Sequence, residues 1–201
     1  MLPRLMLVTD RRLMQPSFGE ALRAALEGGA PLIQLREKDL PLQELQSLAQ
    51  TAQSWCETFG ASLLVNTEIE IAQSVGARGV HWPQRCLEHG IEYSMGALNG
   101  FSVHSVEAAQ RAQEVGADYV VFGAVFPTSS HPGQSAKGID ALHRVTSAVA
   151  LPVYAIGGLD NEEAVQKCLI SGAYGVAVRS SVWEAPDVSQ RVAQLRRWAG
   201  N

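Results

Sequence analysis

Short apolar runs recur along the chain, and each follows a segment with helical periodicity. The repeated phrase is a helical stretch, then Gly-Ala, then an apolar run, as in EGGAPLIQLRE, SVGARGVHW, EVGADYVVFG and SGAYGVAVRS. A glycine just past a helix suits the left-handed conformation in which many helices end. The apolar run that follows suits a strand buried on both faces. The pattern therefore predicts alternating helices and parallel strands.

The spacing of apolar residues places these elements along the chain. Helical periodicity is clearest in SFGEALRAALE, LQELQSLAQTAQSWCETF, SVEAAQRAQEV and NEEAVQKCLIS. Ser105 and Asn161 precede two of these segments, where a side-chain oxygen can cap the first turn. A helix or a helix-sized gap follows each expected strand, and the weakest of these helices lies near 84–92. The strands are expected at about 4–9, 31–36, 62–66, 78–82, 98–103, 118–123, 152–157 and 174–179.

Eight strand–helix units in 201 residues predict one α/β domain over residues 1–201, a small (β/α)8 TIM barrel. The alternative is an open, doubly wound sheet. In such a barrel the active site lies at the rim formed by the carboxyl ends of the strands. Polar groups buried there without partners cost about 1–3 kcal/mol each, so a polar ligand is expected. The polar residues and glycines predicted at this rim are Asp10, Arg36, Lys38, Asn66, His81, His104, Thr128, Gly157, Gly158, Arg179 and Ser180.

The segment QLREK predicts an anion site. Gln34, Arg36 and Lys38 alternate, so they share one face of the strand. Two cations and an amide on one face suit phosphate, which arginine binds through two parallel hydrogen bonds. The alternative is that Glu37 or Asp39 neutralises these cations in a loop.

The ends of the last two strands, YAIGGLDN and GVAVRSS, predict a phosphate site. Gly157 and Gly158 let backbone N–H groups come close to an oxyanion. Barrels of this type often hold phosphate between the loops after strands seven and eight. Arg179, Ser180 and Ser181 can add hydrogen-bond donors there.

The long segment FGAVFPTSSHPGQSAKG is rich in Ser, Thr, Gly and Pro, as a loop that covers substrate would be. Thr128, Ser130 and His131 can bind diphosphate there, and an ordinary surface loop is the alternative. His81 and His104 end strands, so each is either an acid/base or a structural histidine.

Composition narrows the class of protein. The net charge is −4 and no basic block occurs, so nucleic acid is not the expected partner. No apolar run approaches the ~20 residues that cross a membrane. The three cysteines lack C-x-x-C spacing, which argues against disulfides and zinc and favours a reducing cytoplasm. The oligomeric state stays open, a homodimer included.

Seven motifs together resemble the thiamine-phosphate synthase/TenI family: LVTD, QLREK, GVHWPQ, FSVHS, GADYVVFGAVFPT, AIGGL and GVAVRSS, in this order from about residue 6 to residue 182. The resemblance implies a (β/α)8 barrel and thiamine metabolism. The synthase branch joins a pyrimidine methyl diphosphate to a thiazole phosphate and releases diphosphate with the help of Mg²⁺.

The same resemblance assigns residues to the two substrates. It implies that the pyrimidine and its diphosphate are bound by Gln34, Arg36, Lys38 and Asn66. Thr128 and Ser130 match the two threonines of the diphosphate loop. The residues that fall near the thiazole-phosphate pocket are Gly158, Val178 and Ser180.

The chain departs from the synthase pattern at its metal ligands. The pattern has Asn-Asp after strand three and H-x-G-Q-x-D after strand four, where this chain has Thr67 and Cys86 in place of the carboxylates. Neither residue replaces a carboxylate as a ligand of Mg²⁺. The lysine of the diphosphate loop is His131. Without the metal, departure of diphosphate would be severely slowed.

The TenI branch also lacks these carboxylates. Its tautomerases isomerise a thiazole carboxylate phosphate by proton transfer, using a histidine where this chain has Ala124. The sequence therefore favours a TenI-like protein that binds a thiazole phosphate or a related phosphorylated intermediate, without a cofactor. Its activity would be tautomerisation, with His131 or His104 as acid/base. The alternatives are a divergent synthase, which would need Mg²⁺, and a ligand-binding or regulatory protein without catalysis.

Overall fold

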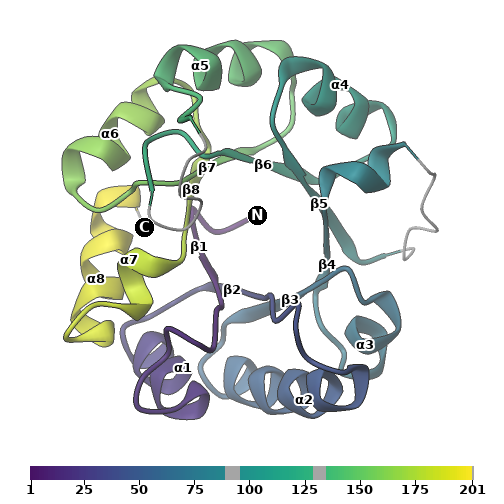
Figure 1. The fold of residues 1–201 in the computed structure, drawn as a ribbon, viewed down its shortest axis with the longest axis vertical. Coiled ribbons are helices and arrows are strands. Elements are labelled where there is room, and N and C mark those ends of the chain that lie inside the picture. The colour runs from purple at the N-terminus through teal and green to yellow at the C-terminus, as the bar shows by residue number, and fades with distance from the viewer. Residues whose placement is uncertain (89–95, 129–134, 201) are drawn as a thin grey trace.

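The computed structural model describes residues 1–88, 96–128 and 135–200. Within these ranges, eight parallel strands close into a barrel in the order in which they follow along the chain (Figure 1). Each lies within one residue of its predicted bounds at both ends. The barrel is confirmed and the open sheet is wrong, because the last strand pairs with the first, Val176 beside Leu5. The strands are β1 (Leu5–Val8), β2 (Leu32–Leu35), β3 (Ser62–Asn66), β4 (Gly79–Trp82), β5 (Leu98–Val103), β6 (Tyr119–Gly123), β7 (Val153–Ile156) and β8 (Gly175–Val178).

Helices form a ring outside the strands (Figure 1). Both predicted caps are confirmed: Ser105 accepts a hydrogen bond from the N–H of Ala108 at 3.2 Å, and Asn161 from that of Ala164 at 2.9 Å. No helix within the described ranges has the length and apolar character needed to cross a membrane. The helices are α1 (Phe18–Glu27), α2 (Leu42–Thr58), α3 (Ile69–Ser74), α4 (Val106–Glu114), α5 (Ile139–Ala148), α6 (Glu162–Ile170), α7 (Ser180–Trp183) and α8 (Val188–Ala199).

The fourth predicted helix, near 84–92, is described only as far as residue 88, and this part does not form an α-helix. A short 3₁₀ helix, η1 (Gln84–Leu87), follows β4, and residues 89–95 lie outside the described part of the chain. Pro83 immediately before η1 has extended backbone angles and no side chain caps the turn. The weak apolar periodicity of residues 84–88 is consistent with the 3₁₀ turn found there.

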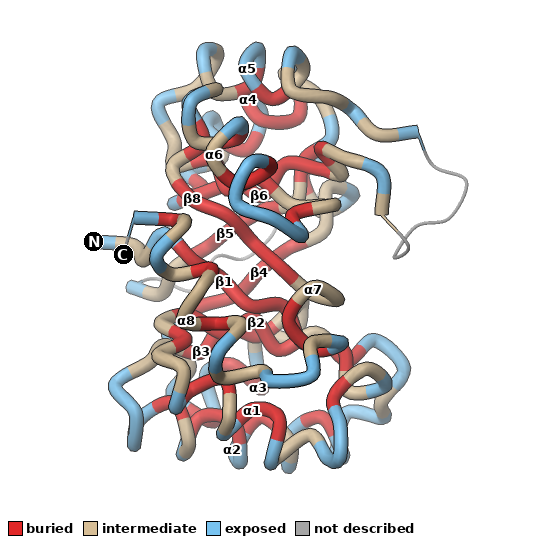
Figure 2. Tube along the Cα trace, turned by 90° about the vertical axis from the view of Figure 1, so that its left-hand side faces the viewer, coloured by how far each residue is buried: buried red, intermediate tan, exposed pale blue. Residues whose placement is uncertain are grey.

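The strands are buried on both faces, and exposed residues gather on the outer helices and loops (Figure 2). Successive residues of a strand point to opposite sides. In β1, Leu5 and Leu7 therefore pack outward against the helices, while Met6 and Val8 point into the barrel. Burial of both faces explains why the strands read as continuous apolar runs.

Tyrosines fill the barrel near the amino ends of its strands. Tyr154 packs edge-on against Tyr119 and Tyr174, with ring centroids 5.6 Å and 5.7 Å away. The hydroxyls of Tyr154 and Tyr174 donate to the backbone carbonyls of Pro3 and Leu2. The chain before β1 is thereby fixed across this end, so that the opposite rim is where the interior opens.

Gly100 provides a test of this packing. A Cβ at Gly100 would lie 1.9 Å from Cζ of Tyr119, inside a filled barrel. Gly100→Ala is therefore expected to lower the free energy of unfolding by about 1–3 kcal/mol, as overpacking does. Gly19→Ala in α1 is the matched control, because a Cβ there meets nothing within 4 Å. It should raise stability by about 0.5–1 kcal/mol. Urea unfolding of both variants measures the difference, and equal effects would contradict the packing.

Candidate functional site at the carboxyl rim

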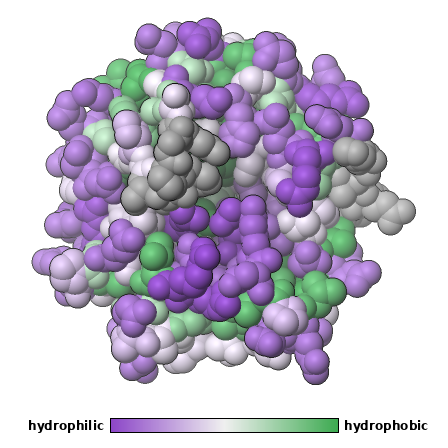
Figure 3. Space-filling view, in the orientation of Figure 1, coloured by the Kyte–Doolittle hydropathy of each residue, from purple (hydrophilic) through white to green (hydrophobic). Residues whose placement is uncertain are grey.

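A cavity of about 300 Å³ opens at the carboxyl ends of the strands. Hydrophilic residues gather around the hollow in the middle of this face (Figure 3). Ser130 and His131 lie outside the described residues. The volume is at the lower end of the range for small-molecule sites. The structure brings the other predicted site residues together along this cavity: Gln34, Arg36, Lys38, Asn66, His81, His104, Thr128, Gly157, Gly158, Val178, Arg179 and Ser180.

The cavity has one polar wall and one apolar wall. The last inward-facing residues of β2 to β5 are Gln34, Asn66, His81 and Ser102, and all four line the cavity. The inward-facing side chains that line the cavity from the other four strands are apolar, namely Val8, Val121, Ile156 and Ala177. A flat ring with polar atoms on one edge would satisfy both walls.

Hydrogen bonds fix the polar groups of the first wall. Gln34 Nε2 donates to Asn66 Oδ1 at 3.2 Å, and Asn66 Nδ2 donates to the hydroxyl of Thr67 at 2.7 Å. The Asn66 amide is therefore held in one orientation. Such fixed groups lose little conformational entropy when a ligand binds.

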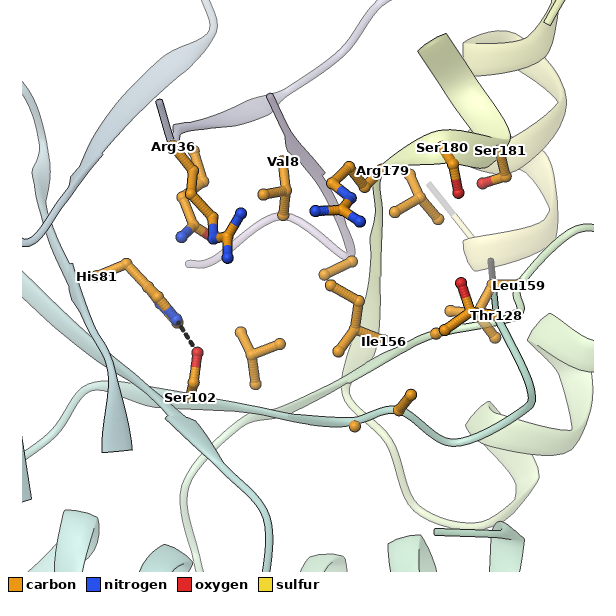
Figure 4. Close-up of a pocket in the computed structure, with 18 of the residues that line it drawn as sticks. Val8, Arg36, His81, Ser102, Thr128, Ile156, Leu159, Arg179, Ser180 and Ser181 are labelled. Carbon is orange, nitrogen blue, oxygen red and sulfur yellow. Dashed lines mark hydrogen bonds between the residues drawn. The ribbon is translucent and has the colours of Figure 1, made fainter. Parts of the chain in front are cut away.

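Ser102 and His81 form a second hydrogen-bonded pair on this wall (Figure 4). His81 Nε2 lies 2.8 Å from Ser102 Oγ, and Nδ1 lies 3.1 Å from the Tyr119 hydroxyl. Sequence reasoning missed Ser102. The available signal was a polar residue within an apolar strand, two positions before His104 and so on the same face.

His81 is suited to a structural role. Burial, and to a smaller extent the charge of Arg36, lowers the pKa of His81 from its ordinary 6.5 to about 3. The imidazole is therefore neutral at physiological pH, and both of its nitrogens face groups of the protein. It positions the Ser102 hydroxyl at the cavity surface.

This pKa predicts a specific pH dependence of stability. Between pH 6.5 and about 3 the unfolded chain binds a proton at His81 that the folded chain does not. The free energy of unfolding should therefore fall as the pH is lowered, with a contribution from this group of up to about 1.4 kcal/mol per pH unit. His81→Gln should remove that contribution, and His143→Gln on the exposed face of α5 should not. Urea unfolding over a pH series measures the slopes, and identical slopes would show that His81 is protonated in the fold.

Two arginine side chains flank Val8 at the rim of the cavity. Arg36 and Arg179 extend toward each other on either side of Val8 (Figure 4). Burial, followed by the charge of Arg179, lowers the pKa of Arg36. Burial and the charge of Arg36 likewise lower the pKa of Lys38. This corner of the rim is therefore strongly electropositive.

The neighbouring carboxylates are engaged elsewhere. The buried Glu37 accepts from the Thr9 hydroxyl at 2.6 Å and from the backbone N–H of Arg11 at 3.0 and 3.1 Å. Asp39 accepts from the Arg11 side chain at 2.6 Å. The alternative that Glu37 or Asp39 pairs with Arg36 or Lys38 is therefore wrong within the described part of the chain.

Asp10 is shared between two arginines. Its two oxygens accept from Arg12 at 2.9 and 3.0 Å, and Oδ2 lies 3.7 Å from Nη1 of Arg179. The hydrogen bond from Arg12 is the main reason that the pKa of Asp10 is lowered. Asp10 does not line the cavity. It holds Arg179 from outside.

The glycine pair after β7 lets two loops approach closely. Gly157 and Gly158 have φ values of 103° and 68°. A Cβ at Gly157 would lie 2.6 Å from that of Ala124, and one at Gly158 would lie 2.6 Å from Cβ of Phe126. The loop after β6 therefore packs directly against this turn, which brings Thr128 to the side of the cavity that holds Ser180 and Ser181 (Figure 4).

The orientation of His104 is set by a backbone carbonyl. Its Nδ1 lies 2.9 Å from the carbonyl oxygen of Gly123. A carbonyl oxygen only accepts, so Nδ1 carries the proton. In the neutral ring, Nε2 is then the basic nitrogen. His104 lines the cavity, and Gln84 accepts a hydrogen bond from its backbone N–H at 2.8 Å.

The rim does not fit Mg²⁺. Thr67 has a φ of 73°, a left-handed conformation that costs a β-branched residue about 1–3 kcal/mol, and its hydroxyl already accepts from Asn66. Among the lining residues that the structure describes, Asp160 is the single carboxylate. The described residues also hold no cluster of three or more His, Cys, Asp or Glu side chains arranged for a metal. Mg²⁺ prefers several hard oxygen ligands, and this rim offers cations instead.

Fold and site define a (β/α)8 barrel with a cationic cavity at its carboxyl rim. The model of the thiamine monophosphate synthase family matches residues 5–182, and the chain belongs to this family. It is 37% identical to the thiamine-phosphate synthase of Pyrococcus horikoshii, over 96% of this chain and 93% of that one. It is 34% identical to that of Clostridium tetani, over 95% and 93%. A solved thiamine phosphate pyrophosphorylase from Pyrococcus furiosus has a TM-score of 0.84 at 33% identity, covering 98% of this chain and 95% of that one.

Proposed function

We propose that the protein joins a pyrimidine methyl diphosphate to a thiazole phosphate in the rim cavity and releases diphosphate. This is the synthase alternative, and it replaces the TenI-like interpretation that the sequence favoured. The names of the similar proteins support the change. The observation that carries the proposal is the guanidinium of Arg36, which lines the cavity, faces Arg179 and forms no ion pair with any described carboxylate.

The reaction makes one bond and breaks one. The lone pair of the thiazole ring nitrogen forms a bond to the methylene carbon of the pyrimidine. The bond from that carbon to the diphosphate oxygen breaks, and its electron pair leaves with the diphosphate. Negative charge therefore develops on the leaving oxygen, where fixed cations stabilise it most effectively. No proton is transferred in this step.

Each wall of the cavity has a part in this proposal. Gln34, Asn66 and Ser102 orient the pyrimidine through hydrogen bonds, since they line the polar wall. The apolar wall packs against the rings and excludes water that would compete with the thiazole nitrogen. The thiazole phosphate binds near Gly158 and Ser180, where backbone approaches closely and hydroxyls face the cavity.

A second candidate is isomerisation of a thiazole carboxylate phosphate by proton transfer. The specific observation in its favour is His104, whose tautomer leaves Nε2 as a base at a cavity-lining position. His104 would then compensate for Ala124, which takes the place of the histidine expected after β6. In this second reaction no diphosphate leaves, so no negative charge develops on a leaving group. Arg36 and Arg179 would then only bind the substrate.

Incubation with both phosphorylated substrates separates the candidates. For the synthase, mass spectrometry should detect the joined product together with an equal amount of diphosphate. Isomerisation of thiazole carboxylate phosphate, followed by NMR, with no joined product would favour the second candidate. Binding of both substrates with neither reaction would identify a ligand-binding protein.

Substitution of His104 tests independently whether the reaction depends on proton transfer by this residue. Loss of a general acid/base typically lowers kcat by roughly 10²–10⁴-fold. His104→Gln should leave the joining rate within about tenfold of the unmodified protein, since that step moves no proton. His143→Gln serves as the control at a remote, exposed histidine. A drop of the joining rate into the range typical of a lost acid/base would contradict the mechanism given above.

A further inference from the structure

We infer that Arg179 and Arg36 form a diphosphate site that works without a divalent cation, with Arg179 supplying the positive charge that Mg²⁺ supplies in the synthase branch. The inference deepens the proposed function and rests on it for the identity of the leaving group. It concerns the same cavity but assigns a role to a residue, Arg179, that the resemblance did not place in contact with the diphosphate.

The topology of the closed barrel places the two arginines on either side of the end of β1. β1 pairs with β2 on one side and with β8 on the other. Arg36 follows β2 and Arg179 follows β8, so the two side chains flank the end of β1. The residue between them is Val8, which contributes no charge (Figure 4). Both guanidiniums line the cavity.

The negative charges near this pair are held outside the cavity. Asp10, which does not line the cavity, binds Arg12 through both oxygens and lies 3.7 Å from Nη1 of Arg179. Glu37 is buried and accepts hydrogen bonds from the Thr9 hydroxyl and from the backbone N–H of Arg11. Asp10 can therefore orient Arg179 without occupying the cavity. The opening between the guanidiniums therefore keeps its positive character.

The balance of charge in the cavity suits diphosphate more than it suits a metal complex. Three cationic residues, Arg36, Lys38 and Arg179, line the cavity together with Asp160 as the single carboxylate of the described lining. Arg36 is partly buried beside a like charge, which costs free energy that a bound anion recovers. Each guanidinium offers parallel N–H donors that match two phosphate oxygens.

This geometry also explains how the carboxylates of the synthase pattern can be absent. A metal ion needs carboxylates to hold it, and it neutralises the diphosphate in return. A guanidinium is covalently attached and permanently charged, so it neutralises the diphosphate without further ligands.

Calorimetry with inorganic pyrophosphate in EDTA tests the inference directly. The unmodified protein should bind one pyrophosphate per chain, and adding Mg²⁺ should leave the affinity unchanged or lower it by sequestering the ligand. Arg179→Gln and Arg36→Gln should each weaken binding at least about tenfold, as expected for loss of a charged hydrogen-bonding group. Arg179→Lys, which keeps the charge but loses the paired donors, should fall between them and the unmodified protein.

The matched control is Arg111→Gln, at an exposed arginine paired with Glu114 on α4. It changes the net charge by the same amount and should leave pyrophosphate binding intact. Circular dichroism checks that each variant is folded. If Arg179→Gln does not fold, Arg179→Lys still tests the role of the guanidinium. Binding that requires Mg²⁺, or that survives Arg179→Gln at full affinity, would overturn the inference.

The outcomes also separate this inference from the proposed function. Metal-dependent pyrophosphate binding together with the joined product would leave the synthase in place and refute the metal-free site. Metal-free binding that depends on Arg179, with no joined product, would support the site and refute the synthase. Formation of the product in EDTA, lost on Arg179→Gln, would support both.

Discussion

Pairing of β8 with β1 is the constraint on which the site depends. Leu5, Met6 and Leu7 of β1 align with Val176, Ala177 and Val178 of β8, and this pairing closes the sheet. In an open sheet of the same order, Arg36 and Arg179 would lie toward opposite edges. Closure leaves only β1 between them and turns two distant strand ends into neighbours. The repulsion between the two guanidiniums is small beside the backbone hydrogen bonds and burial that hold the strands together.

The barrel interior is filled by aromatic side chains at the amino ends of the strands and opens into a cavity with a polar wall at the carboxyl ends. At the amino ends, Tyr119 and Tyr154 fill the space, and Gly100 makes room for the first of them. At the carboxyl ends, Asn66 and His81 face the cavity with their polar atoms bonded to neighbouring side chains. Buried polar groups with partners carry little penalty, so this wall is rigid before any ligand arrives. Arg36 differs from this wall, because its guanidinium forms no ion pair with a carboxylate among the described residues.

The strands were predictable from sequence because each is buried on both faces and is bounded by a glycine or a polar residue. Helix caps at Ser105 and Asn161 were equally predictable, since capping is decided by residues three positions apart. The ion pairs could not be predicted from the sequence. Arg11 is 26 residues from Glu37, and such a partner is selected by the closed barrel, which no local period encodes. For the same reason, the neutralisation of Arg36 by Glu37 remained an open alternative at the level of sequence.

The location of the candidate site could be predicted from the sequence, but the net charge of the residues that line it could not. Alternation along QLREK and the glycine pair placed the cations and the close backbone approach at one rim, and the structure brings them together. Ser102 was not recognised within its apolar strand, and residues 84–87 form the 3₁₀ helix η1 where the start of an α-helix was expected. The missing carboxylates alone favoured a TenI-like branch.

The absence of the metal-binding carboxylates does not by itself exclude the synthase reaction when arginine side chains lie at the same rim. Asp10 faces Arg12 and Arg179 from outside the cavity, so the lining remains predominantly cationic. Electrostatic stabilisation of a leaving group depends on the charge that is fixed near it, and an arginine or a metal ion can supply that charge. Thr67 and Cys86 are therefore consistent with a site in which side chains provide the positive charge. Under this constraint, loss of the carboxylates and placement of Arg179 beside Arg36 are complementary, because the arginine supplies the charge that a metal held by carboxylates would supply.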